Sequence, residues 1–288
     1  RGHTIEKTIE ASRLLKDAGF KLSYQMMLNL PKSSANRDFE MFEQIFENAD
    51  FKPDYLKIYP LALLSEAPLH HLYKNKKFKI YNGSELIDLI KKIKKITPYW
   101  TRIERVIRDI PADKVFEGGV KTSNLRQAIH DQADGLGVIC RCIRCREIKA
   151  RYDPDEKFYL FREDYASAGG REIFLSFESS GRTKLASFLR LRIPSYHFNG
   201  GRHFFKVLEN SAVIREIKSV GELTPVGETK RAPQHKGFGR RLLEESEIIA
   251  QKEFGIKKIA AIAAIGARQY FRKNGYKLKD SYMVKIFK

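Results

Sequence analysis

A glycine-containing loop that joins an apolar extended segment to an amphipathic helix constrains the fold of this chain more than any other stretch. The loop reads Gln-x-x-Gly-x-Gly from Gln234. The extended segment at 211–217 precedes it, and the helix is expected to run to about Gln251. Glycines let backbone N–H groups converge without obstruction by β-carbons, and a helix N-terminus adds partial positive charge. The stretch therefore predicts an anion site that suits a pyrophosphate, with an ordinary tight turn before a helix as the alternative.

The spacing of this loop excludes two common phosphate-binding motifs. It lacks the Gly-x-x-x-x-Gly-Lys-Ser/Thr pattern of the nucleoside-triphosphate P-loop. It also lacks the third glycine of the Gly-x-Gly-x-x-Gly dinucleotide fingerprint. Arg240 and Arg241 add full positive charges to the start of the helix. The pattern thus favours an anion other than a nucleoside triphosphate or a dinucleotide.

The elements around the loop follow the order of an acyl-coenzyme A-dependent N-acetyltransferase-like (GNAT-type) α/β domain, which we expect at residues 153–288. Strands are expected at 158–162, 172–178, 185–193, 212–218, 258–265 and 281–287, with a helix after the loop and another at 267–274. In such a domain the acyl-CoA lies between two splayed parallel strands, here 212–218 and 258–265. The pantetheine would pair with the open backbone of the first strand, and the pyrophosphate would meet the amides that begin the helix.

The residues expected to contact acetyl-CoA lie on that strand, on the loop and on the short helix near the end of the chain. They are Glu216, Ile217, Lys218, Ser219, Gln234, Gly237, Phe238, Gly239, Arg240, Tyr270 and Phe271. The Tyr270 hydroxyl could donate a hydrogen bond to the thiolate or the carbonyl of the thioester, which makes it the predicted catalytic residue. A packed aromatic side chain on a short helix is the alternative for Tyr270.

Residues 1–112 alternate helices with strands, a pattern that predicts parallel β/α units. Helices are expected at 4–18, 35–48 and 84–96, and strands at 21–30, 55–59 and 100–107, the first of them buried. Such units make up about half of a (β/α) barrel and would leave exposed sheet edges, so we expect a fragment of a larger domain. Residues 113–152 contain frequent glycines and short helical signals and are predicted to form a linker module.

The balance of charge favours a polyanionic partner such as nucleic acid. Lys and Arg number 54 against 35 Asp and Glu, which gives a net charge of +19. A lysine-rich surface of the thermophile type is the alternative, although such surfaces usually balance lysine with glutamate. The candidate RNA-contacting residues are Arg102, Arg105, Arg108, Arg141, Arg144 and Arg146. No apolar run is long enough to suggest a membrane-spanning helix.

The only cysteines, Cys140, Cys142 and Cys145, fall within a single short stretch of the predicted linker. A disulfide framework would scatter an even number of cysteines along the chain, so the cluster predicts a metal site in a cytoplasmic protein. Thiolate sulfur suits zinc, which prefers four ligands in a tetrahedral arrangement. His130, His70 and His71 are candidates for a fourth ligand, and a water molecule is another. Three reduced thiols packed in a linker are the alternative.

Several short motifs together resemble the catalytic subunit of Elongator over essentially the whole chain. They are RVIRDIP (105–111), KTSNLR (121–126), RCRE (144–147), GGRE (169–172), QHKGFG (234–239) and YMVK (282–285). The resemblance covers both the subunit of the eukaryotic complex and the stand-alone archaeal and bacterial enzymes. The lysine-rich and isoleucine-rich composition is similar to that of the archaeal members. Further Elongator subunits are not expected as partners of such a member. A homodimer is an alternative that the sequence leaves open.

The resemblance implies the C-terminal part of a radical S-adenosylmethionine (SAM) domain at 1–112, a zinc-bearing linker at 113–152 and a lysine-acetyltransferase-like domain at 153–288. It implies an enzyme that carboxymethylates carbon 5 of the wobble uridine of transfer RNA (tRNA), bound through the anticodon arm. Its cofactors would be acetyl-CoA and zinc, with SAM and an iron–sulfur cluster in the full-length protein. A 5′-deoxyadenosyl radical would abstract hydrogen from the acetyl methyl group before that carbon adds to the uridine.

The chain departs from this family in two respects. The family often has two tyrosines where this chain has Tyr270 followed by Phe271, so any hydroxyl role there falls on Tyr270. No cysteine trio that could hold the iron–sulfur cluster precedes Cys140, so the chain is expected to lack radical chemistry by itself. Two other functions remain open from the sequence: a protein lysine acetyltransferase with Glu216 as general base, and a non-catalytic RNA-binding module.

Overall fold

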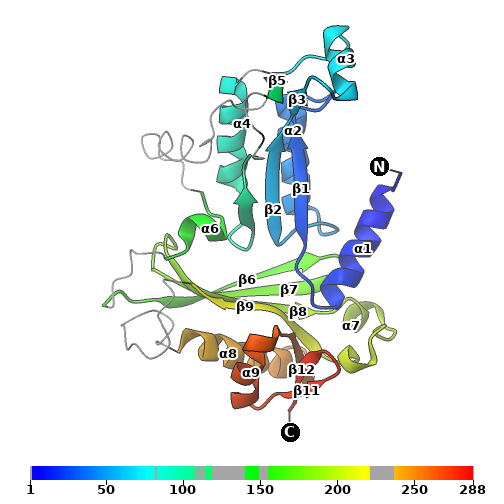
Figure 1. Cartoon of the computed structure of the whole chain (residues 1–288). Helices are drawn as coiled ribbons and strands as arrows, with labels where there is room; N and C mark the ends of the chain where they lie inside the picture. Colours follow the sequence, from blue (N-terminus) through cyan, green and yellow to red (C-terminus); the bar gives the residue numbers. More distant parts are fainter. Residues whose placement is uncertain are drawn as a thin grey trace. The chain divides into compact units, whose positions relative to one another are not determined.

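The computed structural model describes residues 2–81, 83–107, 110, 114–118, 140–148, 155–220 and 237–287 (Figure 1). Its contacts divide the chain into two compact units. The three-stranded unit comprises Ser23–Glu47 and Pro53–Cys145, and the seven-stranded unit comprises Arg1–Leu22, Asn48–Lys52 and Arg146–Lys288. The start of the chain therefore packs with its C-terminal part. The domain boundaries predicted near 112 and 152 fall outside the described residues.

Parallel strands form the main sheet of the three-stranded unit, in the order β1 (Ser23–Leu28), β2 (Tyr55–Pro60) and β4 (Arg102–Arg105). Helices α2 (Ala35–Glu47) and α4 (Gly83–Ile96) pack against each other beside this sheet (Figure 1). The predicted parallel β/α units are thus confirmed. The prediction of a buried first strand is wrong, because β1 lies at an edge of the described sheet and only its last residue, Leu28, is fully buried.

Apolar residues at helical spacing explain why α2 and α4 form and pack here. Their buried members are Phe42, Ile45, Phe46, Leu86, Leu89, Ile90 and Ile93. Four shorter elements were not predicted: β3 (Ala62–Leu64), which pairs antiparallel with β5 (Val115–Gly118), and the helices α3 (Pro68–Lys74) and α6 (Ile143–Arg146). These elements are too short to carry a recognisable hydrophobic period.

The seven-stranded unit contains one mixed sheet in the order β11-β12-β10-β9-β8-β7-β6. The strands are β6 (Tyr159–Ser167), β7 (Gly170–Glu178), β8 (Leu185–Ile193), β9 (Ala212–Ser219), β10 (Lys258–Ile262), β11 (Lys277–Lys279) and β12 (Tyr282–Ile286). Neighbouring strands are antiparallel except for β9 and β10, which are parallel as predicted. The turn between β6 and β7 is a two-residue hairpin in which Ala168 and Gly169 have φ values of 44° and 73°.

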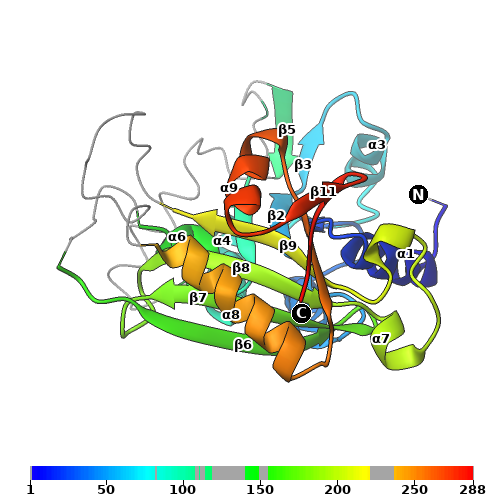
Figure 2. The ribbon, with the colours of Figure 1, turned by 90° about the horizontal axis from the view of Figure 1, so that it is seen from below.

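The two faces of this sheet differ in chemistry. Helix α8 (Phe238–Lys252) lies across one face (Figure 2), where Leu242 and Ile249 join a large apolar core with Ile173 and Leu191. Side chains alternate between the faces of a strand, so Glu172 and Arg192, the neighbours of Ile173 and Leu191, point to the opposite face. Helix α1 (Ile5–Asp17), which begins with Thr4 as N-cap, packs near β8 and places Asp17 against Arg192 on that face.

A segment between β8 and β9 covers part of the polar face and was not predicted. It contains α7 (Tyr196–Asn199) and the 3₁₀ helix η2 (Lys206–Leu208). Val207 and Leu208 anchor it in a small apolar cluster with Val213, Tyr282 and Val284. Within the described ranges, no helix is both long enough and apolar enough to cross a membrane.

Candidate functional site

Strands β9 and β10 run side by side only over their first residues. Ala212–Ile214 pairs with Ile259–Ala261, after which β9 continues to Ser219 along β8 while β10 ends at Ile262. The register of the β8–β9 pairing shifts between Arg190 and Leu191, which leaves Arg215 as the extra residue of a β-bulge. A bulge bends its strand and increases the local twist. The two parallel strands therefore diverge beyond Ile214.

The N-terminus of α8 lies close to the end of β9. Gly237 caps the helix with φ 71°, a left-handed conformation that suits glycine. A β-carbon placed on Gly239 would lie 3.2 Å from the Tyr270 hydroxyl oxygen and 3.7 Å from Ser219 Oγ. Glycine at this position therefore lets hydroxyls from α9 (Arg268–Lys273) and β9 approach the first turn of α8. The first N–H groups of a helix have no intrahelical partner, so hydroxyl and amide donors gather here.

The Tyr270 hydroxyl is held in its protonated form. Tyr270 is 36% exposed, and its partial burial raises the pKa above the ordinary value of 10.0; the nearby Glu244 carboxylate raises it further. The second hydroxyl near Gly239, Ser219 Oγ, lies 3.1 Å from Ser187 Oγ. Ser187 Oγ donates to the carbonyl oxygen of Lys218 at 3.1 Å. The sequence did not single out Ser187, because a serine in a buried strand carries no distinguishing pattern. Its hydroxyl fixes the position of Ser219.

Some of the predicted contact residues have side chains that pack in the apolar core or form ion pairs within the chain. Phe271 and Phe238 are 2% and 5% exposed and belong to the apolar core. Glu216 accepts a hydrogen bond from Nε of the buried Arg190 at 3.0 Å, and Lys21 Nζ lies 3.6 Å away. As a correction, Phe271 offers no side chain to a ligand and Glu216 is not a free general base. Contacts from these residues to a ligand would have to use the backbone.

Ile217, Lys218 and Arg240, which are further predicted contact residues, lie around the same end of β9. The partly buried Ile217 packs against the apolar core, and Lys218 Nζ lies 3.4 Å from Glu147. Arg240 is well exposed on the first turn of α8 and pairs with Glu244 at 2.8 Å. Gln234 lies outside the described residues.

The cysteine cluster forms in the three-stranded unit. The sulfur atoms of Cys140, Cys142 and Cys145 lie within 4.8 Å of one another, and Cys145 N donates to Cys142 O at 3.1 Å as α6 begins. Hydrogen bonds from the other two thiols hold the pKa of Cys142 well below its ordinary value. Three such sulfurs could hold a metal ion. In the described part of the chain neither His70 nor His71 joins the group, and His130 lies outside that part.

Most of the predicted RNA-contacting arginines lie in the three-stranded unit. Arg105, Arg141 and Arg144 are exposed and Arg102 is partly exposed. The Arg141 guanidinium lies 5.5 Å from the centre of the Tyr99 ring, and Arg144 Nη1 donates to the Glu104 carbonyl oxygen at 2.5 Å. Arg108 lies outside the described residues.

Arg146 has to be removed from the predicted RNA-contacting set. It is 3% exposed, and its Nη1 lies 2.7 Å from the carboxylate of Glu178, which is fully buried. If Arg146 turned to a phosphate, it would give up this buried ion pair and leave Glu178 with Arg182 as its cationic partner, 3.0 Å away. The sequence could not show that Arg146 is buried and Arg144 exposed, because both are arginines that flank Cys145.

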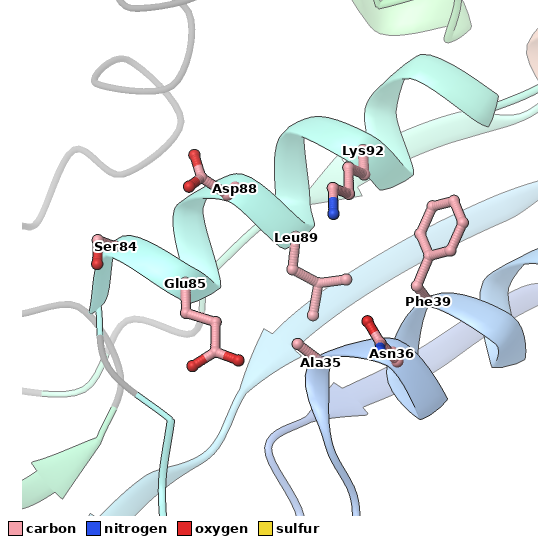
Figure 3. Close-up of a pocket in the computed structure, with 8 residues that line it drawn as sticks. All are labelled: Ala35, Asn36, Phe39, Ser84, Glu85, Asp88, Leu89 and Lys92. Atoms are coloured by element: carbon pink, nitrogen blue, oxygen red, sulfur yellow. The ribbon is translucent and has the colours of Figure 1, made fainter.

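A surface pocket of about 570 Å³ lies between α2 and α4. Figure 3 shows its lining, with Phe39 and Asn36 on α2 facing Leu89, Glu85 and Lys92 on α4. The lining mixes both signs of charge with apolar surface and includes none of the predicted site residues. It therefore adds no chemistry to the groups gathered at the start of α8.

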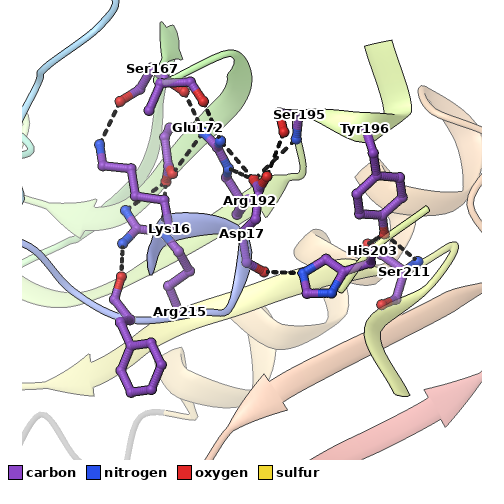
Figure 4. Close-up of polar contacts among 12 residues, drawn as sticks. Lys16, Asp17, Ser167, Glu172, Arg192, Ser195, Tyr196, His203, Ser211 and Arg215 are labelled. Carbon is purple, nitrogen blue, oxygen red and sulfur yellow. Dashed lines mark hydrogen bonds and ion pairs between the residues drawn. The ribbon is translucent and has the colours of Figure 1, made fainter. Parts of the chain in front are cut away.

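A buried network of charged groups joins the end of α1 to the polar face of the sheet (Figure 4). Asp17 accepts hydrogen bonds from Arg192 Nε and Nη2 at 3.0 and 2.8 Å and from Ser195 N at 3.1 Å. Glu172 accepts from Arg215 Nη2 at 2.9 Å and lies 3.4 Å from Arg192 Nη1. All four charged groups are at most 2% exposed. Through Arg215, the network also holds the bulge of β9.

Comparison with known proteins gives matches over the whole chain. A family model described as the Radical_SAM C-terminal domain matches residues 53–134. The tRNA uridine(34) acetyltransferase of Methanocaldococcus jannaschii is 43% identical over 293 residues, which cover 99% of this chain and 53% of that protein. Elongator complex protein 3 of Homo sapiens is 39% identical over 295 residues, which cover 100% of this chain and 53% of that protein. The chain thus spans about half the length of these relatives.

A solved structure matches the fold of the whole chain. It is the archaeal Methanocaldococcus infernus Elp3 with an N-terminal deletion (1–46), which is 41% identical to this chain. The TM-score is 0.89, and the match covers 100% of this chain and 68% of the other.

Proposed function

The chain belongs to the family of Elongator complex protein 3 and the archaeal tRNA uridine(34) acetyltransferases, and we propose on this basis that it binds acetyl-CoA and acts in the modification of the wobble uridine of tRNA. The observation that carries the proposal is the meeting of Gly239, Ser219 and Tyr270 where β9 and β10 diverge. Amide donors, hydroxyl donors and positive charge are the groups that an acyl-CoA requires of a protein.

In this proposal the C-terminal part of the chain is a GNAT-type domain that holds acetyl-CoA against the end of β9. The backbone of residues 216–219 would pair with the pantetheine, and the turn from Gly237 to Arg240 would hold the pyrophosphate, with Gln234 in the same loop. The thioester would then lie near Tyr270 and Ser219. There Tyr270 would donate a hydrogen bond to the carbonyl oxygen or to the departing thiolate.

The complete reaction is proposed for the whole protein, since this chain spans about half of its relatives. It would convert the acetyl group into a carboxymethyl group at carbon 5 of the uridine, in the cytoplasm. The match at residues 53–134 supports SAM and an iron–sulfur cluster as the cofactors that would supply radical chemistry in the whole protein. The exposed Arg105, Arg141 and Arg144 would hold tRNA through its phosphates.

Protein lysine acetylation is less well supported as the activity of this chain. That reaction needs a general base beside the thioester to accept the proton of the attacking ammonium group. Glu216, the sequence candidate, is 7% exposed at its side chain and paired with Arg190. A net charge of +19 would also repel lysine-rich peptides.

We expect tRNA to stimulate acetyl-CoA hydrolysis by the chain, because bound RNA would order the residues around the thioester, where water is the attacking nucleophile. Release of free CoA thiol, measured with and without tRNA, tests this expectation. Turnover that rises with tRNA and not with lysine peptides would support the proposal. Turnover that requires a lysine peptide would instead assign protein acetylation, and no turnover in any mixture would contradict the proposed activity of this chain.

We propose zinc as the metal at Cys140, Cys142 and Cys145, because thiolate sulfur suits zinc in tetrahedral sites. Replacement of Cys142 by serine should reduce the zinc content from about one ion per chain to near zero, since a hydroxyl is a poor zinc ligand. Mass spectrometric metal analysis of purified protein measures this. His70→Ala serves as control and should retain zinc. Zinc in the Cys142→Ser variant, or a metal-free unaltered protein, would contradict the assignment.

A further inference from the structure

The segment from Tyr196 to Lys206, here named the aromatic segment, exposes several rings on the seven-stranded unit. Phe198, Phe204 and Phe205 are 47%, 52% and 43% exposed. The Phe204 and Phe205 ring centres lie 4.7 Å apart, and the Phe198 ring contacts that of His197. Exposed phenylalanines gathered on one short segment are unusual on a protein surface and indicate a binding site.

The scaffold beneath these rings is rigid. The Tyr196 hydroxyl donates to Leu208 O at 2.8 Å, which closes the segment on itself. His203 is buried, and its Nδ1 accepts from Phe205 N at 2.8 Å, so its Nε2 carries the proton and donates to Asp17 O at 3.1 Å. The Phe204 ring stacks on this fixed imidazole at 4.3 Å with an interplanar angle of 25°. A ring held in this way loses little conformational entropy when a ligand stacks on it.

Positive charge is interleaved with these rings. Arg202 is 89% exposed at its side chain and has only a loose contact of 3.5 Å with Glu209, and Lys206 is also exposed. Exposed rings that alternate with cations match nucleic acid, in which flat bases alternate with phosphates. Lysine, by contrast, is depleted in protein–protein interfaces, so the exposed Lys206 fits nucleic acid better.

We propose that the aromatic segment binds unpaired nucleotides of RNA, with bases stacked on Phe204 and Phe198 and phosphates at Arg202 and Lys206. The proposal rests on RNA being the substrate, as proposed above. It adds a surface separate from the arginines of the three-stranded unit and from the residues around Tyr270. Stacking needs bases with a free face, so unpaired loops and ends fit this surface and continuous duplex does not.

The test measures the Kd of fluorescein-labelled RNA by fluorescence anisotropy without acetyl-CoA. The probes are a hairpin with an unpaired loop and a blunt duplex of the same stem. Phe204→Ala should raise the Kd for the hairpin by about 5- to 150-fold, the factor for one lost base stack, and leave the duplex Kd unchanged. Phe204→Leu should do the same, because it keeps apolar surface and loses the ring. Arg202→Ala should reduce the slope of log Kd against log salt by about 0.7.

Ile286→Ala is the matched control, because Ile286 is an apolar residue of β12 that is 73% exposed. It should leave the Kd unchanged, and circular dichroism should show all variants folded. An unchanged hairpin Kd in Phe204→Ala overturns the proposal, as does a loss that Phe204→Leu restores. If Phe204→Ala instead turns a dimer into a monomer by sedimentation with the RNA Kd unchanged, the segment is an interface between copies. No RNA binding by the unaltered chain would contradict the proposed function itself.

Discussion

Replacement of Tyr270 by phenylalanine is expected to lower kcat for acetyl-CoA hydrolysis by about 10²- to 10³-fold, the usual effect of removing one donor to a developing oxyanion or leaving group. The KM for acetyl-CoA should change little, because the lost hydrogen bond strengthens mainly in the transition state. The phenylalanine ring can keep the edge contact that Tyr270 makes with Phe271, whose ring centre is 5.6 Å away. The variant therefore removes the hydroxyl without removing the packing.

The raised pKa of Tyr270 also predicts how the activity depends on pH. Because burial and the Glu244 carboxylate raise its pKa above 10.0, the hydroxyl should remain protonated through neutral and mildly alkaline pH. The activity that depends on it should then persist until the pH exceeds that raised value. Stopped assays of thiol release across this range measure the effect. Tyr159→Phe, on an exposed residue of β6, is the control and should match the unaltered chain. Equal kcat in Tyr270→Phe and the control would exclude Tyr270 as a catalytic residue.

Local patterns predicted most of the regular elements of both units. The apolar period of α8 and the glycines before it identified the helix and its start. These signals are local, because each depends on the conformational preference of a few neighbouring residues. The parallel pairing of β9 and β10 was predicted from the order of elements, which is that of a GNAT-type domain. The same reasoning did not find β3, β5 or η2, which are held in place by contacts with distant residues.

Contacts between distant residues also decided which charged groups are free. Glu216 and Arg146 carry the same sequence signals as exposed residues, yet one faces Arg190 and the other faces Glu178 in the folded chain. In β8, arginines 190 and 192 alternate with leucines 189 and 191, a pattern that ordinarily predicts one apolar face and one solvent-exposed face. In the structure both arginines are buried, because other parts of the chain cover the polar face. Asp17, the partner of Arg192, lies 175 residues away in the sequence and could not be identified without the structure.

Replacement of Asp17 by alanine is expected to lower the free energy of unfolding of the seven-stranded unit by about 3–5 kcal/mol, the usual cost of removing one partner of a buried ion pair. The fully buried Arg192 would lose the two hydrogen bonds that its Nε and Nη2 donate to Asp17, and Ser195 would lose the acceptor for its N–H. Hydrogen exchange of the β8 amides, followed by mass spectrometry, measures this energy in the unit concerned.

Two further variants separate the buried charge from helix packing. Arg162→Ala breaks a partly exposed ion pair with Asp164 and Glu253 and should cost less than about 1 kcal/mol. Because a buried charge left without its partner is the main cost, the double variant Asp17→Leu with Arg192→Met should recover part of the stability lost in Asp17→Ala. Equal losses in Asp17→Ala and Arg162→Ala would show that Asp17 does not hold α1 to the sheet through its charge. No recovery in the double variant would assign the loss to helix packing, because α1 would then depend on the shape of the contact and not on the balance of charge.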